Sequence, residues 1–237
     1  MKRVLVAWSS GKDSAWTLHA LRQQSDVEVV GLLTSFNQAA GRVAMHAVRR
    51  ELVERQAAVT GLPLWSVQLP WSCPNNVYEA RMREAVERAK REGVTHIAFG
   101  DLYLEDIRAY REHTLAGTGV DPIFPIWSSA SDTGRLAREM LAADLRAVIT
   151  CVDPKQLDGR FVGRQFDEEL LTDLPAKVDP CGERGEFHTF CWRGPMFSQQ
   201  IAVRVPGVSF RDGFWFADLL PSEAKPASQL YAVSDRS

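Results

Sequence analysis

Short apolar runs alternate with helical patterns over the first 150 residues, and this alternation constrains the fold more than any other feature of the chain. Short, largely apolar runs of this kind are typical of strands that are buried on both faces of a parallel sheet. Five segments fit this description: Val4–Trp8, Val27–Leu33, Leu64–Leu69, Val94–Phe99 and Ala147–Val152. Strands that alternate with helices predict an α/β fold with a doubly wound parallel sheet. Ligands of such sheets bind beyond the carboxyl ends of the strands.

Apolar residues recur at helical spacing between these runs. The stripes predict helices over residues 45–59, 78–89 and 136–141. Gly61 and Gly93 follow the first two stripes and supply stop signals.

The pattern changes after Asp153. A helix-like stretch over 164–173 precedes three β-prone runs, over 187–192, 200–205 and 214–219. Gly-Pro, Pro-Gly and Asp-Gly pairs separate these runs and predict hairpin-type breaks. The sequence therefore predicts a first domain over 1–153, a smaller C-terminal α+β domain over 154–220 and a flexible tail over 221–237.

The charge balance argues against several classes of partner. Twenty-eight Lys and Arg against 30 Asp and Glu leave a net charge of −2, which gives no support for a broad cationic surface that binds nucleic acid. No apolar run approaches the ~18 residues of a membrane span. The four cysteines include no CxxC pair and are too few for a disulfide framework. We therefore expect a cytoplasmic protein with reduced thiols, without membrane or nucleic-acid partners.

The segment Ser9-Ser10-Gly11-Lys12-Asp13-Ser14 follows the first predicted strand and opens the first helix. Small residues at such a turn let backbone N–H groups approach an anion, and the positive end of the helix dipole adds to the attraction. Asp13 is unusual beside a phosphate, and it favours a bridging Mg²⁺. The Walker pattern is excluded because it would need glycine at Val6, and no GxGxxG is present.

Two further groups of candidates follow strands of the predicted sheet. The run Val94–Phe99 ends in Gly100-Asp101, and Glu105 and Arg108 lie on one face of the helix beyond it. An alternative for the helix is a solvated face with i, i+4 ion pairs. After the second strand, the backbone of Leu33 and the neighbouring Thr34 lie at the same edge of the sheet, with Asn37 and His46 as additional polar candidates. A structural histidine is the alternative for His46.

The segment from Cys181 to Thr189 packs glycines, carboxylates and a histidine together. Glu183 lies between two glycines, and Glu186 and His188 share one face of the strand that follows. This pair could orient or deprotonate an amine, because a neighbouring carboxylate shifts the pKa of histidine toward neutral pH. A zinc site and a Cys/His nucleophile pair remain alternatives, although the spacing of Cys181, His188 and Cys191 matches no common zinc pattern.

Three motifs carry a resemblance to a known family. The loop resembles the SGGxDS pyrophosphate loop of the N-type ATP pyrophosphatases, with Ser10 where glycine is usual. Residues 100–108 (GDLYLEDIR) and 182–190 (GERGEFHTF) resemble two signature regions of the diphthine–ammonia ligase-like family. The resemblance runs from about residue 1 to about residue 220. It is greatest to the shorter bacterial branch, for which a substrate other than the diphthine of elongation factor 2 is expected.

This resemblance implies an adenine nucleotide alpha hydrolase-like fold and a ligase that uses ATP and Mg²⁺. A carboxylate, small or protein-borne, would be adenylated with release of pyrophosphate, and ammonia or an amine would then displace AMP. A homodimer is a further expectation. The alternatives are an RNA-modifying enzyme with the same loop and a non-catalytic ATP-binding regulator.

The resemblance also implies roles for individual residues. The catalytic candidates are Lys12, Asp13 and Asp101, of which Asp13 and Asp101 would also hold Mg²⁺. The nucleotide candidates are Ser9, Ser10, Gly11, Lys12, Asp13, Ser14, Leu33, Thr34 and Gly100. Of these, Leu33 and Thr34 would lie at the adenine ring. The acceptor-substrate candidates are Glu105, Arg108, Glu183, Glu186 and His188.

Overall fold

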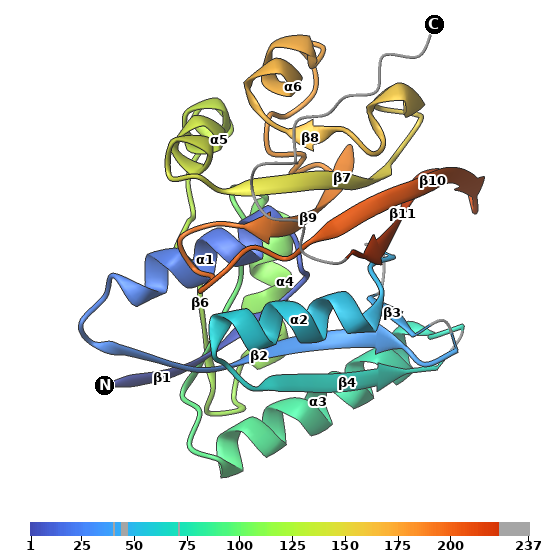
Figure 1. Cartoon of the computed structure of the whole chain (residues 1–237). Helices are drawn as coiled ribbons and strands as arrows, with labels where there is room; N and C mark the ends of the chain where they lie inside the picture. The colour runs from blue at the N-terminus through green and yellow to red at the C-terminus, as the bar shows by residue number, and fades with distance from the viewer. Residues whose placement is uncertain (40, 44–46, 71, 223–237) are drawn as a thin grey trace, which may run out of the picture.

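The computed structural model describes residues 1–39, 41–43, 47–70 and 72–222. His46, the start of the first predicted helical stripe and the predicted tail beyond residue 222 lie outside these residues. The described chain forms two sheets, one from each half of the sequence (Figure 1).

The first sheet is the predicted parallel sheet. Its parallel strands lie in the order β4 (Leu64–Leu69), β2 (Val27–Asn37), β1 (Lys2–Ala7), β5 (His96–Ala98) and β6 (Asp121–Ile123). A sixth strand, β3 (Arg42–Val43), pairs antiparallel with the end of β2. The doubly wound α/β prediction is therefore confirmed for this half of the chain.

The strand order changes direction at β1. From β1 the chain moves outward through β2 to β4, and it then returns to place β5 on the other side of β1. Loops that follow two strands on either side of such a switch diverge and leave a crevice for a ligand. The segments after β1 and β5 are the phosphate loop and Gly100-Asp101, so both lie at the switch point.

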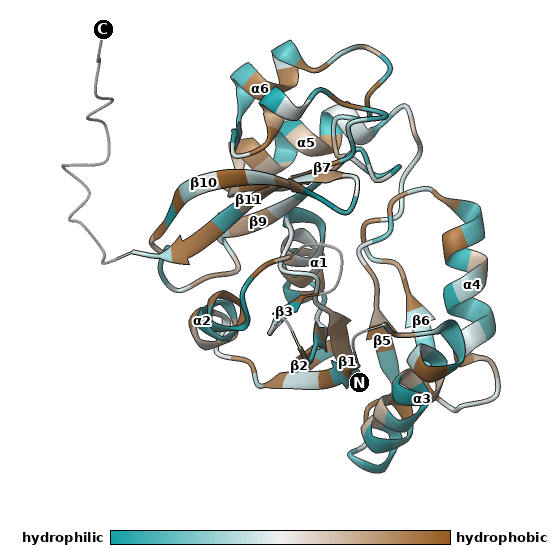
Figure 2. Cartoon of the chain, turned by 90° about the vertical axis from the view of Figure 1, so that its right-hand side faces the viewer, coloured by the Kyte–Doolittle hydropathy of each residue, from teal (hydrophilic) through white to brown (hydrophobic). Residues whose placement is uncertain are grey.

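Two helices cover each face of this sheet. Helices α1 (Lys12–Arg22) and α2 (Arg50–Thr60) lie on one side, and α3 (Asn75–Arg91) and α4 (Glu105–Leu115) lie on the other (Figure 2). The alternation of side chains along β1 explains this division. Val4 and Val6 join the core with α1 and α2, whereas Leu5 joins the core with α3.

The second sheet is antiparallel and is built around β7 (Arg146–Val152). Strand β9 (Phe187–Arg193) pairs along one edge of β7, and β8 (Gln165–Phe166) and β11 (Phe214–Pro221) pair along the other. Strand β10 (Val203–Arg211) pairs with β11 at the outer edge. The helical segments of this half are α5 (Thr133–Ala142), η1 (Gly159–Phe161) and α6 (Glu168–Asp173).

Strand β7 corrects one prediction. The run Ala147–Val152 was expected in the parallel sheet, and this is wrong, because all its partners are antiparallel strands of the second sheet. The strand is buried on both faces, so its composition resembles that of a parallel strand. We therefore propose that the division between the two units lies between Ile123 and Thr133, earlier than residue 153.

Strand β10 corrects a second prediction. Pro206-Gly207 was expected to break the chain between two strands, but β10 continues through it with a shift of register between Arg204 and Gly207. A proline is tolerated there because β10 is an edge strand. The helix expected over 164–173 is also shorter than predicted, since β8 occupies its first part and α6 the rest.

One apolar core joins the two units. It includes Leu18 of α1 and Leu52 of α2 together with Ile149 of β7 and Phe190 of β9. The second sheet therefore packs on the α1–α2 side of the first. None of the helices within the described residues is long and apolar enough to cross a membrane.

Candidate functional site

The phosphate loop connects β1 to α1, as predicted, and Gly11 caps the helix. Ser10 has a φ of 72°, in the left-handed region where an L-residue other than glycine is strained by about 1–2 kcal/mol. The Ser10 side chain is fully buried, and its hydroxyl is the one buried side-chain polar atom without a hydrogen-bond partner among those of the described residues. The chain therefore adopts a costly conformation at the position where the related loops carry glycine.

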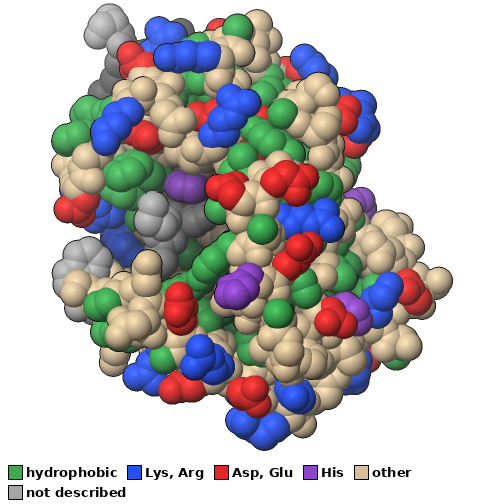
Figure 3. Space-filling view, turned by 180° about the vertical axis from the view of Figure 1, so that it is seen from behind, with side chains coloured by type: hydrophobic (Ala, Val, Ile, Leu, Met, Phe, Trp, Pro, Cys, Tyr) green, Lys and Arg blue, Asp and Glu red, His purple; other side chains and the backbone are tan. Residues whose placement is uncertain are grey.

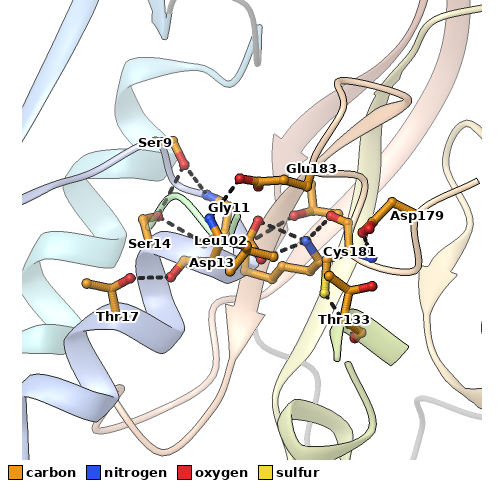
Figure 4. Close-up of polar contacts among 12 residues, drawn as sticks. Ser9, Gly11, Asp13, Ser14, Thr17, Leu102, Thr133, Asp179, Cys181 and Glu183 are labelled. Carbon is orange, nitrogen blue, oxygen red and sulfur yellow. Dashed lines mark hydrogen bonds and ion pairs between the residues drawn. The ribbon is translucent and has the colours of Figure 1, made fainter. Parts of the chain in front are cut away.

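The hydroxyls of Ser9 and Ser14 lie together at the start of α1 (Figure 4). Ser9 Oγ lies 3.2 Å from Ser14 Oγ and accepts a hydrogen bond from the Gly11 N–H at 3.3 Å. Ser14 Oγ donates to the Gly11 carbonyl at 3.0 Å. A first helical turn has no intrahelical acceptors for its N–H groups, so the loop combines hydroxyls, N–H donors and the positive end of the helix dipole.

Gln56 holds the phosphate loop through a hydrogen bond to the Ser10 carbonyl, and sequence reasoning missed this residue. Its Nε2 donates to the carbonyls of Ser10 at 3.0 Å and Cys191 at 2.7 Å, and its Oε1 accepts from the Trp8 indole N–H at 2.8 Å. The Cys191 N–H also donates to the Ser10 carbonyl, at 2.9 Å. The signal available in the sequence was a polar residue on the apolar stripe of a helix, four positions after Leu52.

Thr189 of β9 is a second residue that sequence reasoning missed. Its Oγ1 accepts a hydrogen bond from the Lys12 N–H at 3.1 Å. A Cβ atom on Gly11 would lie 3.2 Å from the Thr189 carbonyl oxygen, so a larger residue would push the two segments apart by a few tenths of an ångström. The loop therefore lies directly against the second sheet.

Lys12 points toward the second unit. Its side chain is 1% exposed, its Nζ lies 2.8 Å from both carboxylate oxygens of Asp13, and it also donates to the Cys181 carbonyl. The rings of Phe166 and Phe187 lie 5.5 Å and 5.7 Å from Nζ. Burial opposes the charge, but the Asp13 carboxylate, together with Cys181 and Glu183, outweighs burial, and the pKa of Lys12 is raised. Lys12 thus connects the phosphate loop with the segment around Cys181.

Gly100 packs against the first turn of α1. A Cβ atom at this position would lie 3.1 Å from the Asp13 carbonyl carbon, the Ser14 nitrogen and Thr17 Oγ1. The glycine therefore allows the loop after β5 to contact α1, whereas the sequence suggested contact with a ligand. Asp101 follows at the same edge and lies 3.3 Å from Arg111 Nε.

Glu183 reaches across to the loop after β5. Its Oε1 accepts a hydrogen bond from the Leu102 N–H at 2.7 Å. Burial raises the pKa of Glu183 to about 7, and the charges of Asp13 and Asp101 act in the same direction. A carboxyl group with such a pKa can exchange a proton near neutral pH.

The Glu186 carboxylate and the His188 imidazole differ in their surroundings. The Glu186 carboxylate accepts from the N–H groups of Asp179 at 2.9 Å and Arg184 at 3.0 Å, so it braces its own loop. Burial and the charge of Lys12 lower the pKa of His188 to about 4. The expected shift of the histidine pKa toward neutral pH is therefore wrong, and the imidazole is neutral at pH 7.

The alternatives around the cysteines gain no support. Burial raises the pKa of Cys181 and of Cys191, so both thiols stay protonated at neutral pH. Across the described chain, no three His, Cys, Asp or Glu side chains form a group that could hold a metal ion.

The remaining candidates have contacts of other kinds. Glu105 is exposed at the start of α4. Arg108 pairs with Glu112 at 2.8 Å, as in the solvated-helix alternative, and its guanidinium lies 4.9 Å from the rings of Phe124 and Trp127.

The two adenine candidates are hydrogen-bonded to the end of β1. The Leu33 carbonyl accepts from the Trp8 N–H at 2.8 Å, and Thr34 Oγ1 donates to the Trp8 carbonyl at 2.9 Å. The Asn37 side chain accepts from the Ala39 N–H at 3.0 Å. The proposed contacts of these residues with an adenine ring stay predictions.

Acidic side chains act on Lys12, the buried cation of the phosphate loop. Asp13 carries the ion pair with Lys12, and the charges of Asp13 and Asp101 both act on Glu183. The polyphosphate of ATP would add further negative charge, which a hard cation bound to carboxylate and phosphate oxygens would offset. Asp13 and Asp101 have the donor chemistry that Mg²⁺ prefers, and the expectation that they hold this ion stays a prediction. Away from this site, basic and acidic side chains are interspersed on the face shown in Figure 3.

Comparisons with known proteins match both halves of the chain. Residues 1–122 match the family described as the diphthamide synthase N-terminal domain, and residues 132–219 match the diphthamide synthase C-terminal domain.

Individual relatives carry the name diphthine–ammonia ligase. The protein from Mus musculus is 26% identical over 223 residues, which cover 85% of this chain and 82% of that protein. Those from Homo sapiens and Rattus norvegicus are 29% and 28% identical over 119 and 121 residues, which cover 48% of this chain. These two matches span 44% of the length of each relative.

Proposed function

The chain belongs to the diphthamide synthase family, and from this premise we propose that it is an ATP-dependent, AMP-forming ligase that joins ammonia or an amine to a carboxylate. The observation that carries the proposal is the phosphate loop at the strand-order switch, with Asp101 after β5 and Glu183 from the second unit beside it. The relatives are named for diphthine and ammonia. For this chain we propose a different carboxylate, small or protein-borne.

The phosphate loop would bind the β- and γ-phosphates of ATP. The hydroxyls of Ser9 and Ser14 and the N–H groups of the first turn of α1 are the donors. Bound Mg²⁺, held by Asp13 and Asp101 with the phosphates, would neutralise charge on the leaving pyrophosphate. Because Lys12 is directed to the Cys181 carbonyl, we assign it to holding the loop and the second unit together around the nucleotide.

The chemistry would proceed in two steps, adenylation of the carboxylate and transfer of ammonia. A carboxylate oxygen attacks the α-phosphorus, the bond to the β-phosphate breaks, and an acyl-adenylate and pyrophosphate form. Ammonia then attacks the acyl carbon, and AMP leaves with the electron pair of the broken C–O bond. The nitrogen loses a proton in this step, and Glu183 is the proposed acceptor because its pKa of about 7 suits proton exchange at neutral pH.

The test is the identity of the nucleotide product. The protein is incubated with Mg-ATP, ammonium chloride and pools of carboxylates, and the products are separated by chromatography. Equal amounts of AMP and pyrophosphate are expected, whereas ADP and phosphate would contradict the proposal. Pyrophosphate release that requires tRNA would favour the RNA-modifying alternative, and tight ATP binding without turnover would favour the regulator.

A matched pair of variants connects the activity to the site. Asp13→Asn removes a carboxylate at the phosphate loop and should lower kcat about 10²–10³-fold, the usual effect of losing an electrostatic stabiliser. Asp106→Asn removes an exposed carboxylate from the first turn of α4 and should leave kcat unchanged. Equal activities of the two variants would place the chemistry elsewhere.

A further inference from the structure

Asp179 is a buried carboxylate that the proposed reaction does not use. It is 5% exposed and lies at the start of the loop that carries Glu183. Its Oδ1 accepts from the Cys181 N–H at 2.7 Å, within the same loop. Its Oδ2 accepts from the Tyr103 hydroxyl at 3.0 Å. Tyr103 belongs to the other unit, because it follows Gly100-Asp101 in the loop after β5.

The loop over residues 179–186 is therefore held at several points. Glu186 braces it internally through the N–H groups of Asp179 and Arg184. Lys12 donates to the Cys181 carbonyl from the phosphate loop. Glu183 and Asp179 both contact the loop after β5, through the Leu102 N–H and the Tyr103 hydroxyl. Leu102 and Tyr103 are consecutive residues, so the Tyr103–Asp179 bond also fixes the position of the Leu102 N–H to which Glu183 is bonded.

We propose that Tyr103 and Asp179 form a positioning pair that holds Glu183 against the loop after β5 and thereby aligns it for the amide-forming step. The inference rests on the proposed ligase function and assigns to it two residues that contact no reacting atom. The hydrogen bond is charge-assisted, since a carboxylate accepts from a phenol.

If Tyr103 and Asp179 position Glu183, loss of the pair should lower kcat and leave the KM for Mg-ATP nearly unchanged. ATP would contact the loop from Ser9 to Ser14, which the Tyr103 hydroxyl does not touch, so the KM for Mg-ATP should change less than about twofold. Misplacement of a reacting group by about 1 Å can cost up to 10²-fold in rate, and a partial loss of alignment should lower kcat about tenfold.

The experiment is a double-mutant cycle on the full chain. Tyr103→Phe removes only the hydroxyl, and Asp179→Asn preserves the acceptor for the Cys181 N–H. The rate of AMP formation is measured with ammonium chloride and the carboxylate that supports turnover of the wild type. Each single variant should lose about tenfold in kcat, and the double variant should lose no more than either single one. Tyr110→Phe, on the exposed face of α4, is the control and should match the wild type.

A second readout does not depend on turnover. Hydrogen–deuterium exchange of residues 179–186 should be about tenfold faster in Tyr103→Phe, with no change in α1, because the loop loses one anchoring bond. Wild-type kcat in Tyr103→Phe, losses that multiply in the double variant, or unchanged exchange in the loop would each overturn the positioning pair. If the wild type forms no AMP, the ligase function fails, and the proposed role of the pair in catalysis fails with it, whereas the exchange experiment still decides whether the pair anchors the loop.

Discussion

Substitution of Gln56 by alanine tests how the two units hold the phosphate loop. Gln56 is fully buried and makes three hydrogen bonds, with the Trp8 indole and with the carbonyls of Ser10 and Cys191. These bonds join the end of β1, the phosphate loop and β9. Alanine removes all three and leaves the Trp8 N–H buried without a partner.

The magnitude follows from the number of bonds. Each neutral hydrogen bond contributes about 1 kcal/mol net, so the loss of three should lower the free energy of unfolding by about 3 kcal/mol. For a chain of this size, 1 kcal/mol corresponds to about 2–4 °C, which gives a fall in Tm of about 6–12 °C. Mg-ATP should also bind more weakly, because the Ser10 carbonyl loses one of its two donors.

Thermal unfolding and titration calorimetry with Mg-ATP measure these effects. Gln165→Ala is a matched control, because Gln165 Oε1 accepts from the Trp192 indole N–H at 3.1 Å but at an exposed position. Its Tm should fall by no more than about 2 °C, since water replaces the lost bond. The reasoning would be refuted if the two alanine variants lost equal stability, or if Gln56→Ala unfolded and bound Mg-ATP as the wild type does.

Three further perturbations test other parts of the structure. Gly100→Ala adds a methyl group 3.1 Å from the backbone of α1 and should cost about 1–3 kcal/mol in chemical denaturation, whereas Gly207→Ala, which meets no atom within 4 Å, should be tolerated. The pKa of Glu183, about 7 in the folded chain, exceeds the value of about 4.3 for an unfolded glutamate, so the folded state binds the extra proton and stability should fall as pH rises from about 5 to about 8. Denaturation midpoints across this range should show a shallower slope in Glu183→Gln, and parallel profiles would contradict the assignment. Asp218 and Arg49 form an ion pair between the two units, with an Nη2–Oδ2 distance of 2.7 Å. Asp218→Asn weakens this pair and should lower Tm by no more than about 4 °C, because the pair is partly exposed. A larger fall would mean that this contact holds the units together.

Local sequence patterns determined much of the first unit. The apolar runs of β1, β2, β4 and β5 each predicted a strand, and the small residues after β1 predicted a strand-to-helix phosphate loop. These features depend on neighbours within a few residues, namely side-chain periodicity and the conformational freedom of small residues at a turn. The three motifs that carry the family resemblance are also short local patterns, and the resemblance agrees with the family matches over both halves of the chain.

Only the tertiary structure decided which partners these segments meet. An apolar run shows that a strand is buried but not the direction of its neighbours, so β7 was assigned to the wrong sheet. The sequence placed the Lys12 side chain beside phosphate. In the structure this side chain donates to the Cys181 carbonyl, 169 positions away in the chain. Gln56, Thr189 and the Tyr103–Asp179 pair act through similarly distant contacts, and such contacts exist only once both units have packed into one core.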